Sequence, residues 1–490
     1  MASGLPDYVA SAQPVPKEKR IAWFSSTAQT YAGIMLWFVF WQDVPVGAGI
    51  DPAKGEFSMF AGGTLAQGLG VALLGVVLAA LICHFLFYLV PGMLGMKTGL
   101  PLYIVGTSTY GVTGGFLMPG FLMGLLQFGW LAVNAYFASE LLAGFFLKNA
   151  TNTPLHMTIG VIWAVTAAFI GLKGIHYVAR VATYLPLIPL IILLILAGRV
   201  FSGVGEFDPA VLLAGSSVAT PSSFELMLFA IANIVGFFAT AGAAGADVAS
   251  SNRDRRDVQL GGLFGVAGST ILTGCLALVI VAGTYGAGLA GAGAGIDPTK
   301  LMDVIVGEQV TKVFWLLLAV AAFPSACFSS LIAANSFKNT LPRVNPFISC
   351  GIGTAASVAL VLSGAAGDAA KMFGIIGASF GPICGAMAAD YLLAKCQWPG
   401  PRAGFNPAGW LSWAVGFYVG AIGMINATVQ APEFAEKFPQ IANYVSKVAI
   451  QVYCPPVAAI VVGFVLYYIL AKAGLLTRTL EMPQTAKAEA

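Results

Sequence analysis

Long apolar stretches without charged residues recur along the whole chain, and this feature limits the possible folds more than any other. Residues 115–139, for example, contain no Asp, Glu, Lys or Arg. A helix needs about 20 mainly apolar residues to cross a bilayer, where its backbone polar groups must be paired internally. Only 9% of the 490 residues are charged, whereas soluble domains carry about a quarter. The sequence therefore predicts an all-α polytopic membrane protein.

The hydropathy pattern predicts twelve spans, and the positions of the basic residues support that number. With the N-terminus inside, sixteen of the 24 Lys and Arg residues lie in inner segments, as the positive-inside rule expects. We therefore expect a multi-pass protein of the cell (inner) membrane, in contact with the lipid bilayer, with both termini in the cytoplasm. The predicted spans are residues 25–47, 60–90, 118–146, 155–174, 177–200, 224–246, 258–286, 312–337, 346–364, 371–394, 408–429 and 449–471.

Two of the predicted spans are interrupted. The first contains Gln42, Asp43 and Pro45, and the sixth contains a Gly/Ala/Thr stretch at residues 236–247 that commits poorly to a helix. Interrupted helices in corresponding positions of two halves are typical of transporters built on inverted repeats. We therefore divide the chain into a cytoplasmic tail (1–24), a first inverted repeat (25–200, spans 1–5), a second inverted repeat (224–394, spans 6–10), two additional C-terminal helices (408–471) and a second cytoplasmic tail (477–490).

A primary amide and an indole lie close together within one apolar segment, at Gln127 and Trp130. An unpaired amide in hydrocarbon costs roughly several kcal/mol, so Gln127 must bond a neighbouring helix or face a cavity. Trp130 follows three residues later and lies beside it on a helix surface. The pair is explained either by packing between helices or by a site for a small, planar, hydrogen-bonding ligand.

The rest of the sequence argues against other classes of function. The net charge of +3 gives no reason to expect a nucleic-acid partner, and the seven cysteines form no C-x-x-C pair. We find no Ser/His/Asp arrangement, metal-ligand spacing or phosphate-binding loop, so we expect no enzyme and no organic cofactor. We expect Asp247 and Asp390 to pair with loop cations or helix N-termini, whereas Glu140 is a candidate proton acceptor.

Three segments carry motifs that occur together in one order. Residues 94–138 contain GMKTGLP, a Tyr-Gly-Val-x-Gly turn and Gln-x-Gly-Trp; residues 235–254 end in Ala-Asp and a basic loop; residues 386–393 contain Ala-Asp-Tyr. Together they resemble the nucleobase–cation symporter family, which includes the cytosine permeases and the hydantoin transporter. The resemblance implies a five-plus-five inverted-repeat fold and alternating access. It also implies uptake of a planar heterocycle (purine, pyrimidine, hydantoin or allantoin type) with Na⁺ or H⁺.

The resemblance implies which residues bind this substrate. Gln127 would bond the edge of the heterocycle, and Trp130 would stack on its face. Phe238, rather than Phe237, would form the opposite wall. Two further amides complete the implied set: Asn335 and Gln42.

The resemblance also implies a sodium site beside that pocket. Its ligands would be the hydroxyls of Ser329 and Ser330 and the backbone carbonyls of Ala326, Phe38 and Trp41. Carbonyls of an unwound helix are usual sodium ligands in such transporters. If the two serines only bond back to carbonyls of the preceding turn, the coupling ion would be a proton instead.

The sequence departs from the family pattern at two places. Met123 stands where some relatives carry Trp, and residues 329–333 read Ser-Ser-Leu-Ile-Ala where the cytosine permeases have Thr-Thr-Asn-Asp-Asn. These departures favour a related ring over cytosine itself. A related symporter for an amino acid or an amine remains an alternative, although residues 36–44 lack the glycine-rich break that usually holds a carboxylate.

Overall fold

The computed structural model describes residues 5–50, 57–173, 183–214, 220–291, 293–341 and 343–482 of the chain. Within these residues, ten helices are long and apolar enough to cross a membrane. They correspond to ten of the predicted spans and confirm an all-α membrane fold. These helices are α4–η4–α5 (Leu69–Thr98), η5–α8 (Phe116–Gly144), α9 (Pro154–Lys173), α11–η6 (Leu187–Glu206), α13 (Ser223–Ala243), α15–η7–α16 (Arg255–Gly286), α18 (Glu308–Thr340), α20 (Ala369–Leu393), α21 (Pro407–Gln430) and α24 (Pro455–Lys472).

The two remaining predicted spans contain shorter helices. Residues 25–47 form α2 (Thr27–Met35) and α3 (Phe38–Asp43), and residues 346–364 form α19 (Pro346–Leu362), which has 17 residues. The start of the predicted fifth span, residues 177–182, lies outside the described part of the chain.

Short elements connect the membrane helices. After α3, the strands β1 (Ala48–Ile50) and β2 (Phe57–Met59) pair antiparallel. The other short elements are α1 (Asp7–Ala10), η1 (Lys17–Lys19), η2 (Trp23–Ser25), η3 (Gly63–Leu65), α6 (Leu102–Val105), α7 (Thr107–Tyr110), α12 (Ala210–Leu213), α14 (Gly245–Ala249), α17 (Met302–Val306), η8 (Ala365–Gly367), α22 (Pro432–Ala435) and α23 (Pro439–Val448).

Both spans that the sequence marks as interrupted are broken in the structure, although the first break lies at Trp37, whereas Gln42 and Asp43 belong to α3. Trp37, with φ −61° and ψ 128°, is extended and separates α2 from α3. Its N–H bonds the Ile34 carbonyl at 3.3 Å, one residue closer than in an α-helix. In the second half the interruption is smaller: α13 ends at Ala243, α14 begins at Gly245, and Ala244 between them keeps right-handed backbone angles. Such breaks leave backbone groups unpaired within a span, which is how transporters of this design expose ion and substrate ligands.

A π-helical turn interrupts the second and the seventh predicted spans. The turns are η4 (Cys83–Tyr88) and η7 (Leu263–Gly268), each continuous with α-helix on both sides. The hydroxyl of Tyr88 donates to the carbonyl of Val258 at 3.1 Å, so the two helices touch near these turns. π-Helical turns are rare, and their occurrence at corresponding positions supports an internal repeat. The exact division at 25–200 and 224–394 remains a prediction.

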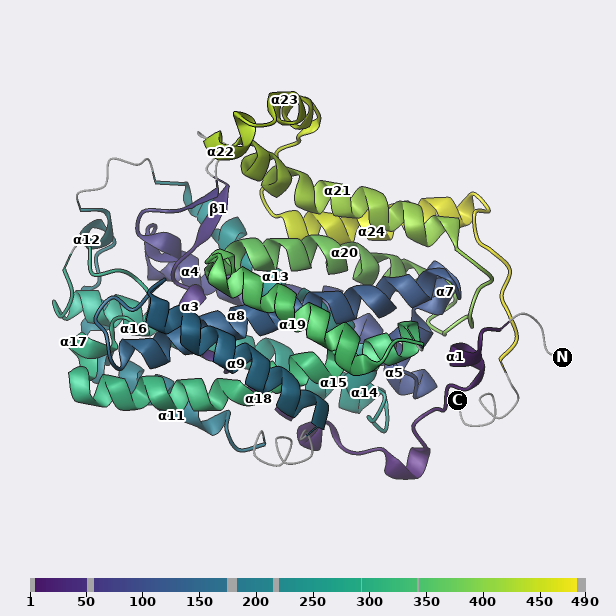
Figure 1. The fold of residues 1–490 in the computed structure, drawn as a ribbon, viewed down its shortest axis with the longest axis horizontal. Coiled ribbons are helices and arrows are strands. Elements are labelled where there is room, and N and C mark those ends of the chain that lie inside the picture. Colours follow the sequence, from purple (N-terminus) through teal and green to yellow (C-terminus); the bar gives the residue numbers. More distant parts are fainter. Residues whose placement is uncertain are drawn as a thin grey trace.

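Helix α20 is the most buried of the ten membrane helices. Its Gly377 and Gly385 approach Pro456 and Ile460 of α24 so closely that an added Cβ would collide with them. Small residues of this kind allow membrane helices to pack with little space between their backbones. Figure 1 shows α21 and α24 running along α20 on one side of the molecule, with α1 at the end where α24 finishes.

A buried ion pair closes that end of α20. Asp390 accepts from Arg402 at 2.8 Å, from the hydroxyl of Tyr467 at 2.8 Å and from the hydroxyl of Ser108 at 2.7 Å. A buried carboxylate is tolerated only when it is paired and hydrogen-bonded in this way. The cluster therefore joins α7, α20, α24 and the loop after α20, which is the structural role predicted for Asp390.

Candidate functional site

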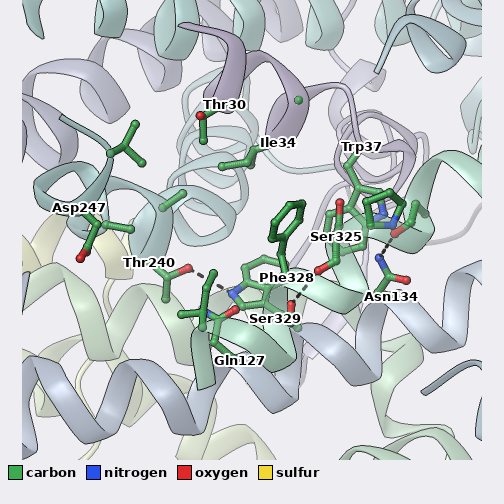
Figure 2. Close-up of a pocket in the computed structure, with 18 of the residues that line it drawn as sticks. Thr30, Ile34, Trp37, Gln127, Asn134, Thr240, Asp247, Ser325, Phe328 and Ser329 are labelled. Atoms are coloured by element: carbon green, nitrogen blue, oxygen red, sulfur yellow. Dashed lines mark hydrogen bonds between the residues drawn. The ribbon is translucent and has the colours of Figure 1, made fainter. Parts of the chain in front are cut away.

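A cavity of about 720 Å³ lies between the broken helices α2–α3 and α13–α14 on one side and α8 and α18 on the other. Cavities of roughly 300–1,000 Å³ hold small-molecule ligands in proteins. In Figure 2, Asp247 lies at one end of the lining and Asn134 and Trp37 at the other, with Gln127, Thr240 and Ser329 between them. Among the described residues that line the cavity, Asp247 alone carries a formal charge.

Gln127 lies in this cavity on α8. The residue is 7% exposed, and its amide nitrogen donates to the thioether sulfur of Met123 at 3.6 Å. A thioether is a weak acceptor. A ligand carbonyl or ring nitrogen is therefore a better partner for this amide than the one it has in the structure.

Trp130 lies in the same lining and is held from the opposite side of the cavity. Its indole Nε1 donates to the hydroxyl of Thr240 on α13 at 3.1 Å. Its ring meets Phe237 at a centroid distance of 5.2 Å and an angle of 81°, and Phe373 at 5.6 Å and 31°. Edge-to-face and tilted arrangements are favourable for aromatic rings. The indole is thus fixed in orientation by one hydrogen bond and by its aromatic neighbours.

The two adjacent phenylalanines of α13, Phe237 and Phe238, face different surroundings. Phe237 lines the cavity, whereas Phe238 is fully buried and packs on Tyr31 of α2 at a centroid distance of 5.6 Å. Because successive residues of a helix point about 100° apart, only one of this pair can face Trp130. In this structure that residue is Phe237.

One face of α18 completes the cavity. Ser325 and Ser329 both belong to it, and the Ser329 hydroxyl donates to the Ser325 carbonyl at 3.2 Å, a common bond for a membrane serine. Asn335 lines the cavity further along the same helix.

Ala326 and Ser330 lie on the back of α18. Both are fully buried, and neither is among the residues that line the cavity. The carbonyl of Ser330 lies 3.9 Å from the sulfur of Cys350 on α19, and its Cβ lies against Gly171 of α9. Ser330 therefore faces away from the cavity, whereas Ser329 lines it.

The broken first span contributes Trp37 and Phe38 to the lining. One turn further along α3, the indole of Trp41 donates to the Leu36 carbonyl at 3.2 Å. The side-chain oxygen of Gln42 lies 3.5 Å from the hydroxyl oxygen of Thr299.

Of the ten residues that the family resemblance implied, the cavity therefore brings five together. These five are Gln127, Trp130, Asn335, Ser329 and Phe38; the five that do not line it are Phe238, Gln42, Ser330, Ala326 and Trp41.

A turn at residues 297–300 lies against α3, where Thr299 is next to Gln42. The Thr299 hydroxyl donates to Asp297 at 2.7 Å, and the Thr299 carbonyl accepts from the Trp315 indole at 3.1 Å. Lys300 lies 3.6 Å from the carboxylate of Glu140, which also accepts from Thr151. Burial raises the pKa of the Asp297 carboxyl above its usual range, and Lys300 acts in the opposite direction. Glu140, the candidate proton acceptor, is thus paired with a cation at this end.

Sequence reasoning missed several polar residues of the lining, among them Thr240 and Asn134. The Asn134 amide donates to the Ala322 carbonyl at 3.0 Å and accepts from the Trp163 indole at 3.0 Å, so it joins α8 to α18 and α9. Asn134 follows Gln127 by seven residues, and this two-turn spacing could have placed it on the same face. Thr240 gave no such signal, because a hydroxyl among small residues usually bonds its own helix.

Asp247 lies at the other end of the lining. Its carboxylate accepts from the backbone N–H of Leu102 at 3.3 Å, at the start of the short helix α6. This is the contact with a helix N-terminus that the sequence predicted. The residue also faces the cavity, which the sequence did not indicate.

Comparison with known protein families gives a match over most of the chain. A family described as permeases for cytosine/purines, uracil, thiamine and allantoin matches residues 56–397. The cytosine permeases of Escherichia coli O157:H7 and Escherichia coli strain K12 are each 30% identical to the chain over 213 residues. These matches cover 41% of this chain and 45% of each permease, which is less than half of either protein.

Solved structures show the same fold. The inward-facing conformation of Mhp1 has a TM-score of 0.66 and 15% identity, and the match covers 100% of this chain and 98% of that chain. Mhp1 in a closed conformation with bromovinylhydantoin bound, described as a nucleobase-cation-symport-1 family transporter, has a TM-score of 0.53 and 17% identity over 92% and 99%. An outward-open Na⁺-coupled sialic acid symporter has a TM-score of 0.51 and 12% identity over 97% and 93%. At these identities the similarity concerns the fold.

Proposed function

The chain belongs to the family of permeases for cytosine/purines, uracil, thiamine and allantoin, and we propose that it imports a planar heterocycle by cation symport. Family membership confirms the resemblance to nucleobase–cation symporters and makes the chain a membrane transporter rather than an enzyme. Our proposed substrates are a purine, a pyrimidine, a hydantoin or allantoin. We further propose that it lies in the inner membrane with both termini in the cytoplasm.

The observation that carries this proposal is the pairing of Gln127 and Trp130 in one cavity. Among the described residues, the acceptor for the Gln127 amide nitrogen is a thioether, and the Trp130 indole is fixed by Thr240. A flat ring can stack on the indole while its polar edge bonds the amide, which uses both groups at once. In this proposal Phe237 forms part of the aromatic wall, and Asn335 supplies a second amide.

Alternating access is the proposed mechanism, and two features of the cavity support it. The lining includes Gln29 in the first turns of α2 and Asp247 in α14, so the cavity extends toward that end of the broken helices. At the opposite end, Thr299 contacts Gln42. Movement of the broken helices against α8 and α18 would release this contact. Gln42 and Phe238 are then proposed to join the substrate site in another state of the cycle.

We propose Na⁺ as the coupling ion, with Ser329 as a ligand. The cavity places the hydroxyls of Ser325 and Ser329 opposite the break between α2 and α3, whose backbone includes Phe38. Hydroxyls and carbonyls of an interrupted helix suit a hard monovalent cation. Ala326, Ser330 and Trp41 would need to approach the cavity in another state to take part. If Na⁺ has no effect, Asp247 is the described lining residue that can carry a proton.

The proposal is tested by a ligand screen on the purified protein in detergent. Purines, pyrimidines, hydantoins, allantoin and, for comparison, amino acids are added singly, with Na⁺ or with choline, and the melting temperature is measured. A bound ligand stabilises the folded state according to its concentration relative to its Kd. We expect a rise for at least one heterocycle that is larger in Na⁺. If amino acids raise the melting temperature and no heterocycle does, the alternative amino acid symporter replaces this proposal.

A further inference from the structure

The short helix α23, between α21 and α24, is amphipathic. Its sequence PQIANYVSKV places Ile441, Val445 and Val448 at helical spacing on one face, and Phe438 just before the helix continues that face. Tyr444 lies at the edge of the same face. The opposite face carries polar side chains: Gln440, Asn443, Ser446 and Lys447.

Most of the apolar face is not covered by the protein. Phe438 is 49% exposed, Ile441 is 48% exposed and Tyr444 is 68% exposed, and Ala442 is the one residue of α23 that is buried. One edge of the helix is fixed to α21, because the Gln430 amide donates to the Ala442 carbonyl at 2.7 Å. The Tyr418 hydroxyl also donates to the Val448 carbonyl. The helix is therefore held in place with its large apolar side chains facing outward.

The position of α23 shows what these side chains face. Figure 1 shows α22 and α23 beside the end of α21 that is remote from α1, with α23 seen nearly end-on while α21 and α24 run across the view. The helix therefore crosses the direction of the spans. Exposed apolar residues of α21, such as Val415 and Ile425, are of the kind that face lipid in a membrane protein, and α21 is the helix to which α23 is bonded.

We propose that α23 lies in the plane of the bilayer interface and binds the phospholipid surface of the leaflet remote from α1. The face with Phe438, Ile441 and Tyr444 enters the boundary between headgroups and acyl chains, as amphipathic interfacial helices do. Lys437 lies just before the helix, and Lys447 lies on its polar face near the C-terminal end. Their long side chains reach the phosphates while their stems stay in the apolar zone.

A second copy of the chain is a poorer occupant of this face. A helix of ten residues is about 15 Å long, and three large side chains cover far less than the roughly 800 Å² per partner of a stable interface. Binding of α23 to the bilayer surface needs no such minimum buried area, because the neighbouring spans already hold the protein in the membrane.

The test uses spin labels at two adjacent positions on opposite faces, Tyr444→Cys and Asn443→Cys. Each is made in the full-length chain with exposed Cys396 replaced by Ser, and each protein is reconstituted into phosphatidylcholine–phosphatidylglycerol vesicles. Power saturation then compares collisions of the label with oxygen, which concentrates in lipid, and with a water-soluble nickel chelate. Both substitutions are at exposed positions, so both proteins should fold.

We expect the ratio of oxygen to nickel accessibility to be several-fold higher for the label at 444 than for the label at 443. Equal, high nickel accessibility at both positions would overturn the proposal, since α23 would then stand in water. Dipolar broadening at 444, which disappears on dilution with unlabelled protein, would overturn it in favour of a second copy. Neither result depends on which substrate the cavity takes.

Discussion

At the scale of single residues, the cavity depends on the bond between the Trp130 indole and the Thr240 hydroxyl. Trp130 belongs to α8, whereas Thr240 belongs to the broken helix pair α13–α14. The bond therefore crosses the cavity and sets the plane on which a ring can stack. It also gives the indole N–H a partner in an apolar surrounding, where an unpaired donor costs about 1–3 kcal/mol.

We expect Thr240→Val to weaken heterocycle binding by about fivefold to tenfold, because losing one such bond corresponds to about 1 kcal/mol. The matched control is Thr240→Ser, which keeps the hydroxyl and should bind within about twofold of the unmodified protein. Equilibrium binding of a radiolabelled ligand to both proteins provides the measurement. Equal affinity for the Val and Ser variants would show that this bond does not position Trp130.

At the scale of elements, the two sides of α18 have different roles. Ser325 and Ser329 face the cavity, whereas Ser330 is buried on the back of the helix against α9 and α19. A run of two serines in the sequence could not reveal this difference, because the rotation of a helix is fixed by the helices that pack on it. Gly171 of α9 lies close to Cys327 and Ser330 of α18. The face of α18 that carries Ser330 therefore packs on α9 and points away from the cavity.

This difference leads to opposite expectations for two neighbouring substitutions. Ser329→Ala should raise the Na⁺ concentration for half-maximal stimulation of binding by about tenfold or more, since a hydrogen-bonding group on a charge contributes about 1.5–3 kcal/mol. Ser330→Ala should leave that concentration unchanged. Ligand binding measured over a Na⁺ titration, with choline keeping the ionic strength constant, distinguishes them. If only Ser330→Ala alters the Na⁺ response, α18 presents its other face to the ion.

Much at this scale could be predicted from the sequence. The apolar stretches located the membrane helices, and Pro45 and the Gly/Ala/Thr stretch marked the two broken spans. The choice between Phe237 and Phe238 could not be made in that way, because adjacent residues of a helix differ only in the direction that packing assigns to them. The π-helical turns η4 and η7 also left no pattern in the sequence.

At the scale of the whole molecule, the site depends on contacts between distant segments. Asp390 was predicted to pair with a loop cation or a helix N-terminus, and it bonds Arg402 of the loop after α20. Its other partners are far away in the sequence: Ser108 by 282 residues and Tyr467 by 77 residues. The turn at Thr299 similarly contacts Gln42, which is 257 residues away in the sequence. Such pairings depend on the assembled fold, whereas Gln127 and Trp130 share one helix and could be identified from spacing alone.

The central claim is that the cavity around Gln127 and Trp130 carries a planar heterocycle across the membrane. The most direct measurement is Na⁺-gradient-driven uptake of the radiolabelled heterocycle that stabilises the protein best, into proteoliposomes that contain the unmodified chain, Gln127→Ala or the surface control Gln440→Ala. We expect uptake with the unmodified chain and with Gln440→Ala. Uptake at limiting substrate should fall about tenfold or more with Gln127→Ala, because a lost amide bond to a polar ring in a dry site costs about 1–3 kcal/mol. Undiminished uptake by Gln127→Ala, reconstituted at the same density, would contradict the account.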